Sequence, residues 1–413
     1  MMRTSESEHE SFPWRPKTMR VTKIEELHCL AGWRPFSFLK VSTDEGLVGW
    51  SEFSMPFGGM QLSHVIRAMS GLVIGEDPQR FERTITTLAA TRVQSNGGLV
   101  QITISAIENA LIDIKAKALG IRACDLFGGA VREQVPMYWS HCGTYRLRNA
   151  ADCNVLPLRT LDDIVKLGEE VKASGYRALK TNTFIFKDGE IGSYRPGLSR
   201  VPGHPECNID NEILGGMADQ LAALRQGAGP DIGLMIDLNL HVHPEGLRRV
   251  ARTIAPYDMT WLEYDLYDPA AMARLRHQID MPLASYECLF GRRVFRPYFE
   301  AGSADVAIID VLWNGLGESL KIAAMADSFG VNVAPHNYYS PLASAISGHF
   351  SAAVPNFSIM ETDVDVVPWH DDIVTPALRV ENGCFILPDG PGWGVEVNEE
   401  VVRAHPVPAP RAN

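Results

Sequence analysis

The chain has 413 residues, a formal net charge of −12, and 46% hydrophobic against 21% charged residues. This length leaves room for a barrel of about 250 residues together with a second domain. The acidic balance argues against a nucleic acid or an anionic membrane surface as a partner. No apolar run reaches the roughly 18 residues that a membrane-spanning helix needs, so we expect no membrane span.

The N-terminal stretch is polar and lacks the apolar core of a signal peptide, so we expect a disordered tail over residues 1–18. The seven cysteines are scattered without a C-x-x-C pair, which is typical of reduced thiols in the cytoplasm. Cys288, beside Glu287, could be read as a nucleophile. No histidine adjoins it in the sequence, and a structural thiol is the favoured interpretation.

Residues 19–134 predict an α+β capping domain. Alternating residues indicate an antiparallel meander with a turn at Asp44-Glu45-Gly46, and helical periodicity follows. The predicted strands are 20–30, 36–43 and 47–53, and the predicted helices are 60–74, 77–90 and 101–120.

Residues 135–368 predict a barrel whose first strand begins at VPMYWSHCG and whose second strand is YRALKTN. The segment 184–207 then follows, rich in Gly and Pro and without periodicity, which is typical of a lid or substrate loop on the catalytic face. It accounts for the 57 residues between Lys180 and Asp237. Strand-like runs in 369–413 are expected to return and complete the sheet of the cap.

After this insertion the chain repeats a unit of nearly constant length. Six residues able to handle a metal or a proton are separated by 26, 24, 23, 26 and 25 residues, and each closes an apolar run typical of a buried parallel strand. They are Asp237, Glu263, Glu287, Asp310, His336 and Glu361. The pattern predicts an α/β fold, a modified (β/α)8 barrel of the TIM type, with its chemistry at the C-terminal ends of the strands.

The first three of these residues come from consecutive predicted strands, so their carboxylates should converge on one side of the barrel mouth. Asp237, Glu263 and Glu287 would give three hard oxygen ligands with open positions, which suits Mg²⁺. Any one of them alone would be read as a solvated surface charge. Together, at matched strand ends, they predict a metal site.

The next two strands predict a proton-transfer pair. Asp310 would orient the ring of His336 and leave its second nitrogen to take a proton, although a core histidine satisfied by an aspartate is the alternative. Lys180 would face the metal and stabilise an enolate or an anionic substrate, or else form a structural ion pair. Glu361 could hydrogen-bond a substrate carboxylate, for which it would have to be protonated.

These residues, with their flanking motifs, resemble the mandelate racemase subgroup of the enolase superfamily, and within it the galactonate-dehydratase-like acid-sugar dehydratases. The resemblance covers about Arg20 to Val402. It rests on EGLVGWSE, AIENALIDIKAKALG with LFGG, LKTN, IDLN, WLE, ASYECLFGR, VAIIDV with NGLGESLKIAAMADSFGV, APH and GPGWGVEV. It implies that Asp237, Glu263 and Glu287 bind Mg²⁺, that Asp310 and His336 form the catalytic dyad, that Lys180 is the electrophilic lysine, and that Glu361 is the carboxylate-side hydrogen-bond donor.

Two departures from the family pattern concern proton transfer. Racemases of the subgroup carry K-x-K on the second strand, whereas this chain has Asn182 at the second lysine position, and an amide cannot act as a base. The dehydratases carry a histidine two residues past the first metal ligand as the general acid, and this chain has Asn239. The proton for the departing hydroxyl would then come from His241, His141, Tyr338, Tyr339 or His336 itself. The usual Glu-Glu-Pro after the fourth strand is altered to Glu263-Tyr264-Asp265.

We therefore predict a cytoplasmic lyase, a Mg²⁺-dependent dehydratase of a sugar acid such as galactonate or gluconate, and expect it to be a homo-oligomer. Asn182, Asn239 and His241 are expected to contact the substrate. Specificity should lie in 33–36, in 53–60 and in the 184–207 insertion. The alternatives are a cycloisomerase, lactonising or racemase-type enzyme of the superfamily, or a non-catalytic relative. His241-Val242-His243 hints at an amidohydrolase metal site. In amidohydrolases, however, the H-x-H motif belongs on the first strand, whereas here it lies past the third.

Overall fold

The computed structural model describes residues 19–54, 59–95, 97–187, 190–194, 208–239 and 242–408. The predicted tail, His241 and most of the 184–207 insertion lie outside these ranges. No helix within them has the length and apolar character required to cross a membrane.

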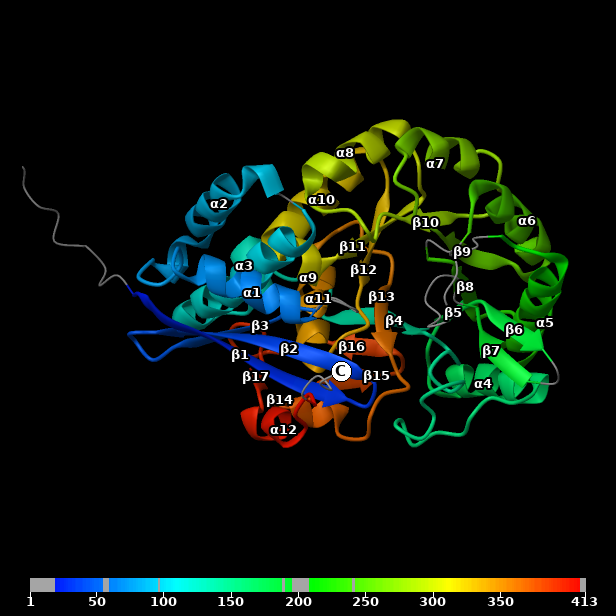
Figure 1. Cartoon of the computed structure of the whole chain (residues 1–413), viewed down its shortest axis with the longest axis horizontal. Coiled ribbons are helices and arrows are strands. Elements are labelled where there is room, and N and C mark those ends of the chain that lie inside the picture. Colours follow the sequence, from blue (N-terminus) through cyan, green and yellow to red (C-terminus); the bar gives the residue numbers. More distant parts are fainter. Residues whose placement is uncertain are drawn as a thin grey trace, which may run out of the picture.

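The cap is an antiparallel sheet covered by helices, on the left of Figure 1. The sheet has the order β1 (Val21–Ala31), β2 (Arg34–Thr43) and β3 (Val48–Glu52), as the alternating pattern predicts. The helices are α1 (Gly59–Ser70), α2 (Phe81–Thr91) and α3 (Gly98–Leu119). Helix α3 is buried on nearly every side, and its buried Asp113 accepts a hydrogen bond from the Trp50 amide at 2.9 Å, which fixes α3 to β3.

The barrel, on the right of Figure 1, is built from eight parallel strands. Seven of them pair in the order of the chain, and the eighth pairs back to the first. Phe357, just before the eighth strand, forms an isolated bridge with Val333 of the seventh. The strands are β4 (Gln134–Ser140), β5 (Ala178–Asn182), β8 (Gly233–Asp237), β9 (Met259–Glu263), β10 (Leu283–Ser285), β11 (Val306–Asp310), β12 (Asn332–His336) and β13 (Met360–Asp363).

Helices follow the first seven strands, and the eighth unit is incomplete. They are α4 (Leu161–Ala173), α5 (Asn211–Ala228), α6 (Pro244–Ile254), α7 (Pro269–Arg276), α8 (Arg292–Ala301), the pair α9 (Val311–Asn314) and α10 (Leu316–Ser328), and α11 (Pro341–Ala353). After β13 the only helical elements of the described chain through residue 408 are the 3₁₀ turn η5 (His370–Ile373) and the short α12 (Glu399–Ala404). The barrel is therefore modified at its last unit.

The barrel interior explains why polar residues gather at one end of it. A buried layer takes one side chain from each of seven strands: Tyr138, Ala178, Met235, Trp261, Ala284, Ile308 and Ala334. Side chains alternate along a strand, so the residue two positions later points the same way, one layer nearer the C-terminal end. That next layer holds Lys180, Asp237, Glu263, Asp310 and His336.

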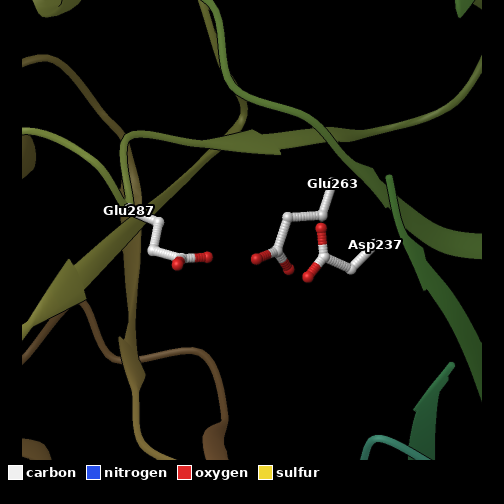
Figure 2. Close-up of side chains that lie close together, drawn as sticks. All are labelled: Asp237, Glu263 and Glu287. Carbon is white, nitrogen blue, oxygen red and sulfur yellow. The ribbon is translucent and has the colours of Figure 1, made fainter. Parts of the chain in front are cut away.

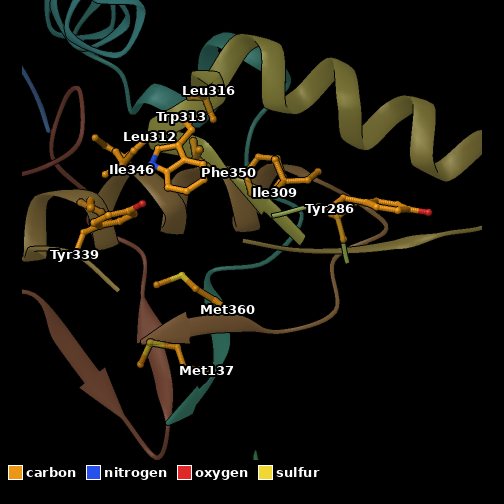
Figure 3. Close-up of a cluster of buried hydrophobic side chains, with 14 of the residues drawn as sticks. Met137, Tyr286, Ile309, Leu312, Trp313, Leu316, Tyr339, Ile346, Phe350 and Met360 are labelled. Atoms are coloured by element: carbon orange, nitrogen blue, oxygen red, sulfur yellow. The ribbon is translucent and has the colours of Figure 1, made fainter. Parts of the chain in front are cut away.

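A second apolar core lies outside the barrel strands, against α9 and α11 (Figure 3). Its buried members come from both helices and strands. Among them are Trp313 of α9, Ile309 of β11, Phe350 of α11 and Met360 of β13. Trp313 also donates from its ring nitrogen to the carbonyl of Ser54 at 3.2 Å, so this core connects the barrel to the cap. The mouth of the barrel is thereby held under the edge of the cap.

The expected path of the C-terminal segment is partly wrong. Strand β16 (Cys384–Ile386) pairs antiparallel with the first half of β4 and carries β15 (Arg379–Glu381), while β14 (Val374–Thr375) pairs with β17 (Glu396–Val397). The cap sheet keeps three strands among the described residues. Residues 134–136 of β4 run below the barrel and offer β16 an edge, because β13 pairs only with 137–140. The segment still reaches the cap, since the Trp393 amide donates to Asp113 at 3.0 Å.

Candidate active site

Three carboxylates converge at the mouth of the barrel. Asp237 and Glu263 end β8 and β9, and Glu287 lies two residues beyond β10. Each offers an oxygen within 4.8 Å of the other two, and Figure 2 shows the three side chains pointing toward a common space. The structure therefore brings together the three residues that the spacing of the strands predicted to meet.

The electrostatics of this cluster favour a cation. Burial, reinforced by the charge of Asp237, raises the pKa of Glu263 to about 7 against the opposing effect of Lys180. Burial likewise raises the pKa of Glu287 to about 8, with His336 opposing it and Asp237 adding to it. A divalent cation among the three oxygens would relieve this mutual repulsion, and an all-carboxylate donor set with open positions fits Mg²⁺.

Glu287 reaches the cluster through a local exception to strand geometry. It lies three residues beyond the interior Ala284, and Tyr286 between them has φ +93°. Asp265 accepts hydrogen bonds from the amides of Tyr286 and Cys288 at 2.7 and 3.1 Å, on both sides of Glu287. Asp265 thus fixes the turn that directs Glu287 inward.

The predicted dyad lies beside the carboxylates. His336 Nδ1 is 2.6 Å from Asp310 Oδ2, and both residues are buried. Asp310 also accepts from the Tyr339 hydroxyl at 2.5 Å and from the Trp313 amide at 2.8 Å. His336 Nε2 lies 3.4 Å from Glu287 Oε1, so the nitrogen not held by Asp310 faces the candidate metal site.

The proton affinity of His336 reflects these neighbours. Burial lowers the pKa of His336, but the charge of Glu287 and the hydrogen bond to Asp310 outweigh burial and raise the pKa to about 10. Both of these neighbours are carboxylates that favour the protonated ring, and a cation held by Glu287 would offset the effect of that glutamate.

Lys180 is buried between two carboxylates, 3.1 Å from Glu263 and 3.1 Å from Glu361. Burial opposes its charge, but the two glutamates raise the pKa of Lys180 well above its ordinary value. The lysine therefore stays charged at the mouth of the barrel, and the ion pair weighed as an alternative is present.

The expected donor role of Glu361 is not compatible with its surroundings. Its oxygens accept from the Asn337 amide at 2.8 Å and from the Ser140 hydroxyl, and one of them pairs with Lys180. Burial alone would raise the pKa of Glu361, but Lys180 and His336 hold it well below its ordinary value. Glu361 is therefore an ionised acceptor that positions Lys180 and Asn337.

The two asparagines are held by the protein itself. Asn239, with φ +49°, donates its amide and its side-chain nitrogen to the two oxygens of Asp237, both at 2.6 Å. Asn182 accepts from the Thr144 hydroxyl at 2.9 Å and donates to the Asp237 carbonyl at 3.4 Å. Both asparagines line the cavity described next, while His241 lies outside the described residues.

These groups open into one cavity of about 510 Å³ between the barrel mouth and the cap. The cap contributes Trp33, Arg34 and Pro35 from the predicted specificity segment 33–36 and Ser54 from the predicted segment 53–60. Phe36 is instead buried against other residues. Ser193 and Tyr194 line the cavity from the insertion, in which β6 (Phe184–Lys187) and β7 (Glu190–Ser193) form a hairpin. The sequence had indicated no periodicity there.

Two groups of functional side chains were missed by the reasoning from sequence. Asp363 follows Glu361 by two residues on β13 and pairs with His141 at 2.9 Å and with Arg34 at 2.8 Å. The signal was available, because residues two apart on a strand face the same side. Asp265 had been noticed only as a departure from the family pattern.

A barrel with three convergent carboxylates, a buried aspartate-histidine pair and a charged lysine at its mouth defines a class of enzyme that abstracts a proton beside a bound metal ion. Comparisons with known proteins agree. Residues 163–401 match the family model described as enolase C-terminal domain-like. Residues 13–128 match that of the mandelate racemase / muconate lactonizing enzyme N-terminal domain. The chain belongs to the mandelate racemase / muconate lactonizing enzyme group of the enolase superfamily.

Individual relatives span several activities. A Burkholderia xenovorans LB400 protein, named provisionally as an L-alanine-DL-glutamate epimerase and bound to magnesium and fumarate, has a similar structure, with a TM-score of 0.91 and 43% identity over 94% of this chain and 96% of that chain. A "D-galactonate dehydratase family member" from Streptomyces bingchenggensis is 28% identical over 94% of each chain. A D-galactarolactone cycloisomerase from Agrobacterium fabrum is 28% identical over 91% of this chain and 93% of its own.

Proposed function

We propose that this enzyme is a Mg²⁺-dependent hydro-lyase that converts a sugar acid, such as galactonate or gluconate, into a 2-keto-3-deoxy acid. The observation that carries the proposal is the asymmetry of the site. His336 Nε2 faces the carboxylates, where it can act as a base, whereas the second-strand position used for a base by racemases holds Asn182. Several relatives named D-galactonate dehydratase support the same class of reaction.

Each residue has a part in this chemistry. His336 Nε2 would remove the proton α to the substrate carboxylate, while Asp310 holds Nδ1 and fixes the ring. Mg²⁺, held by Asp237, Glu263 and Glu287, would supply positive charge to the substrate carboxylate as negative charge develops there. Lys180 adds a second positive charge on the other side, and Glu361 keeps it in place.

Most of the barrier reduction must come from these charges. The α-proton is far less acidic than an imidazolium, so the base alone cannot make its removal favourable. Loss of the 3-hydroxyl from the enolate then gives an enol, which tautomerises to the 2-keto-3-deoxy acid.

One other activity has a specific observation in its favour. The Agrobacterium relative is named a cycloisomerase, and such a reaction uses the same α-proton abstraction with a ring oxygen as leaving group. The epimerase name of the Burkholderia protein is a weaker guide, since Asn182 provides no base for the opposite face.

The test is a screen of sugar acids and their lactones for 2-keto product, with Mg²⁺ and with EDTA. We expect product from at least one aldonate, its loss with EDTA, and its recovery on addition of Mg²⁺. Full activity in a metal-free sample, or turnover of lactones without any 2-keto-3-deoxy acid, would contradict the proposal.

A further inference from the structure

A second imidazole-carboxylate pair lies at the mouth of the barrel, outside the predicted dyad. His141 follows β4 directly, and its Nδ1 is 2.9 Å from Asp363 Oδ1 on β13. Arg34 of the cap lies 2.8 Å from the other oxygen of Asp363. The Asp363 and Arg34 side chains are only 2% and 12% exposed, so the pair that holds His141 is an internal one.

The His141 ring is fixed so that one nitrogen faces the cavity. The residue has φ +47°, and its ring stacks on Tyr145 with centroids 4.8 Å apart and planes at 23°. Nδ1 is engaged by Asp363, and Nε2 has no hydrogen-bond partner among the described residues. Because His141 lines the same cavity as the metal carboxylates, Nε2 is the nitrogen that can meet a substrate.

The two histidines lie near each other but differ in their charge environment. Both rings pack beside Tyr338, at centroid distances of 4.8 Å for His336 and 5.7 Å for His141. The Asp310 carboxylate is held by His336, an amide and a hydroxyl, with no other cation among its partners in the described part of the chain. Asp310 is therefore not shared with a guanidinium, as Asp363 is.

Asp363 is already balanced by a guanidinium. Burial would raise the pKa of Asp363, but Arg34 and His141 hold it below its ordinary value, so it is a carboxylate. Because Arg34 pairs with the same carboxylate, Asp363 is shared between the two side chains, and its hydrogen bond to Nδ1 fixes the orientation of the His141 ring. The pair thus holds the second nitrogen of His141 in place at the cavity.

Dehydration requires a proton donor, because hydroxide is a poor leaving group at neutral pH. Asn239 gives its backbone N–H and a side-chain N–H to Asp237 and, as an amide, has no proton to transfer. Tyr339 donates its hydroxyl proton to Asp310, which commits it to the dyad.

We propose that His141 is the general acid of the dehydration, an inference that rests on the proposed function. His336 takes the C2 proton, and the electron pair of that bond is held in the enolate of the substrate carboxylate. This pair then forms the C2–C3 double bond as the C3–O bond breaks. The oxygen takes the Nε2 proton of His141 and leaves as water. The enol then gains a proton at C3 and loses its hydroxyl proton, and the two histidines return to their starting states by exchange with solvent.

The test separates leaving-group protonation from every other role of His141. The His141→Gln variant, with Mg²⁺, is assayed on the best sugar acid and on its 3-deoxy-3-fluoro analogue, whose fluoride leaves without a proton. We expect a loss of about 10²- to 10⁴-fold on the hydroxy acid and a rate near that of the wild type on the fluoro acid. Exchange of the α-proton with D₂O should persist in the variant.

Controls distinguish the possible failures. His28→Gln, a half-buried cap histidine bonded to Ser37, should behave as wild type on both substrates. The inference would be overturned, and the proposed function left intact, if His141→Gln dehydrated the hydroxy acid at the wild-type rate. An equal loss of rate on both substrates would have the same meaning. A leaving-group-dependent loss confined to Tyr338→Phe would transfer the role to Tyr338. A wild-type enzyme that gives no 2-keto acid would overturn the proposed function, and this inference with it.

Discussion

The two ring nitrogens of His336 serve different partners, and this division determines what each substitution should do. His336→Asn removes the acceptor nitrogen, so exchange of the α-proton with D₂O should fall by about 10²- to 10⁴-fold. Asp310→Asn should lose less, because Tyr339 and Trp313 still position residue 310 and only ring basicity suffers. NMR of the α-proton signal measures both effects. Exchange at the wild-type rate in His336→Asn would show that another group is the base.

Asn182 restricts the stereochemistry of the reaction. With one base, on the side of β12, the enzyme should act on a single configuration at C2, which in this family corresponds to a 2R acid such as gluconate or galactonate. Racemisation would need a proton returned to the opposite face, and Asn182 cannot deliver one. A 2R substrate in D₂O should therefore give 2-keto-3-deoxy acid and no 2S epimer by chiral chromatography. Interconversion of 2R and 2S forms as fast as dehydration would reject the one-base mechanism.

Individual site residues differed in how far the sequence could identify them. Asp237, Glu263, Asp310 and His336 were accessible because each ends an apolar strand. His141 and Arg34 were named separately, as a candidate proton donor and as part of the segment 33–36, but their contact through Asp363 was not predicted. The three come from the cap, the end of the first barrel strand and the last barrel strand, and only the closed barrel brings them together. The ionised state of Glu361 likewise depends on neighbours from other strands.

At the scale of elements, the turn after β10 depends on one side chain. Asp265→Ala removes the acceptor that holds the amides on both sides of Glu287, so the ligand should lose its orientation. Loss of such an outer partner costs about 10- to 100-fold in metal affinity, which titration calorimetry with Mg²⁺ can measure.

A matched control lies three residues away. Asp268 caps α7 by accepting from the Ala271 amide at 2.9 Å, so Asp268→Ala should cost about 1 kcal/mol of stability without weakening the metal. Equal Mg²⁺ affinity in Asp265→Ala and wild type would rule out the positioning role of Asp265.

The bounds of a strand could be predicted where the apolar run alone determines them. Strands β8, β9 and β11 have the bounds of their apolar runs, because each is buried on both sides. Strand β10 ends early at Ser285, since Asp265 draws the following amides into a turn. The placement of β16 was wrong because strand propensity does not specify a partner, and the free edge of β4 below the barrel is visible only in three dimensions.

At the scale of the whole molecule, His349 lies where three parts of the chain meet. It belongs to α11, and its Nδ1 accepts a hydrogen bond from the Cys124 amide at 3.4 Å, at the junction of cap and barrel. Its ring packs on Trp393 with ring centroids 5.6 Å apart. Burial lowers the pKa of His349 to about 4. In the unfolded chain His349 takes up a proton below about pH 6.5, whereas in the folded chain it stays neutral to a lower pH.

Folding stability should accordingly fall with acidification. Neutral His349 makes its full contribution to the free energy of unfolding above pH 6.5, and this contribution is lost as the pH falls from there toward 4. The loss amounts to about 2 kcal/mol between pH 7.5 and pH 5. Urea unfolding at the two pH values should show a smaller acid loss in His349→Gln than in wild type. His64→Asn, at an exposed position on α1, should keep the full loss. An unchanged loss in His349→Gln would place the acid sensitivity elsewhere.

Strand β4 is completed from very distant parts of the chain. Its second half pairs with residues 360–363 and its first half with residues 384–386, while His141, directly after it, lines the cavity. During synthesis on the ribosome, this strand must wait until all the other barrel strands have been made before either of these partners exists. The barrel can close only after β13 has been made, and until then the edge of β4 is open to incorrect pairing. Segments made late thus complete the support of the first barrel strand.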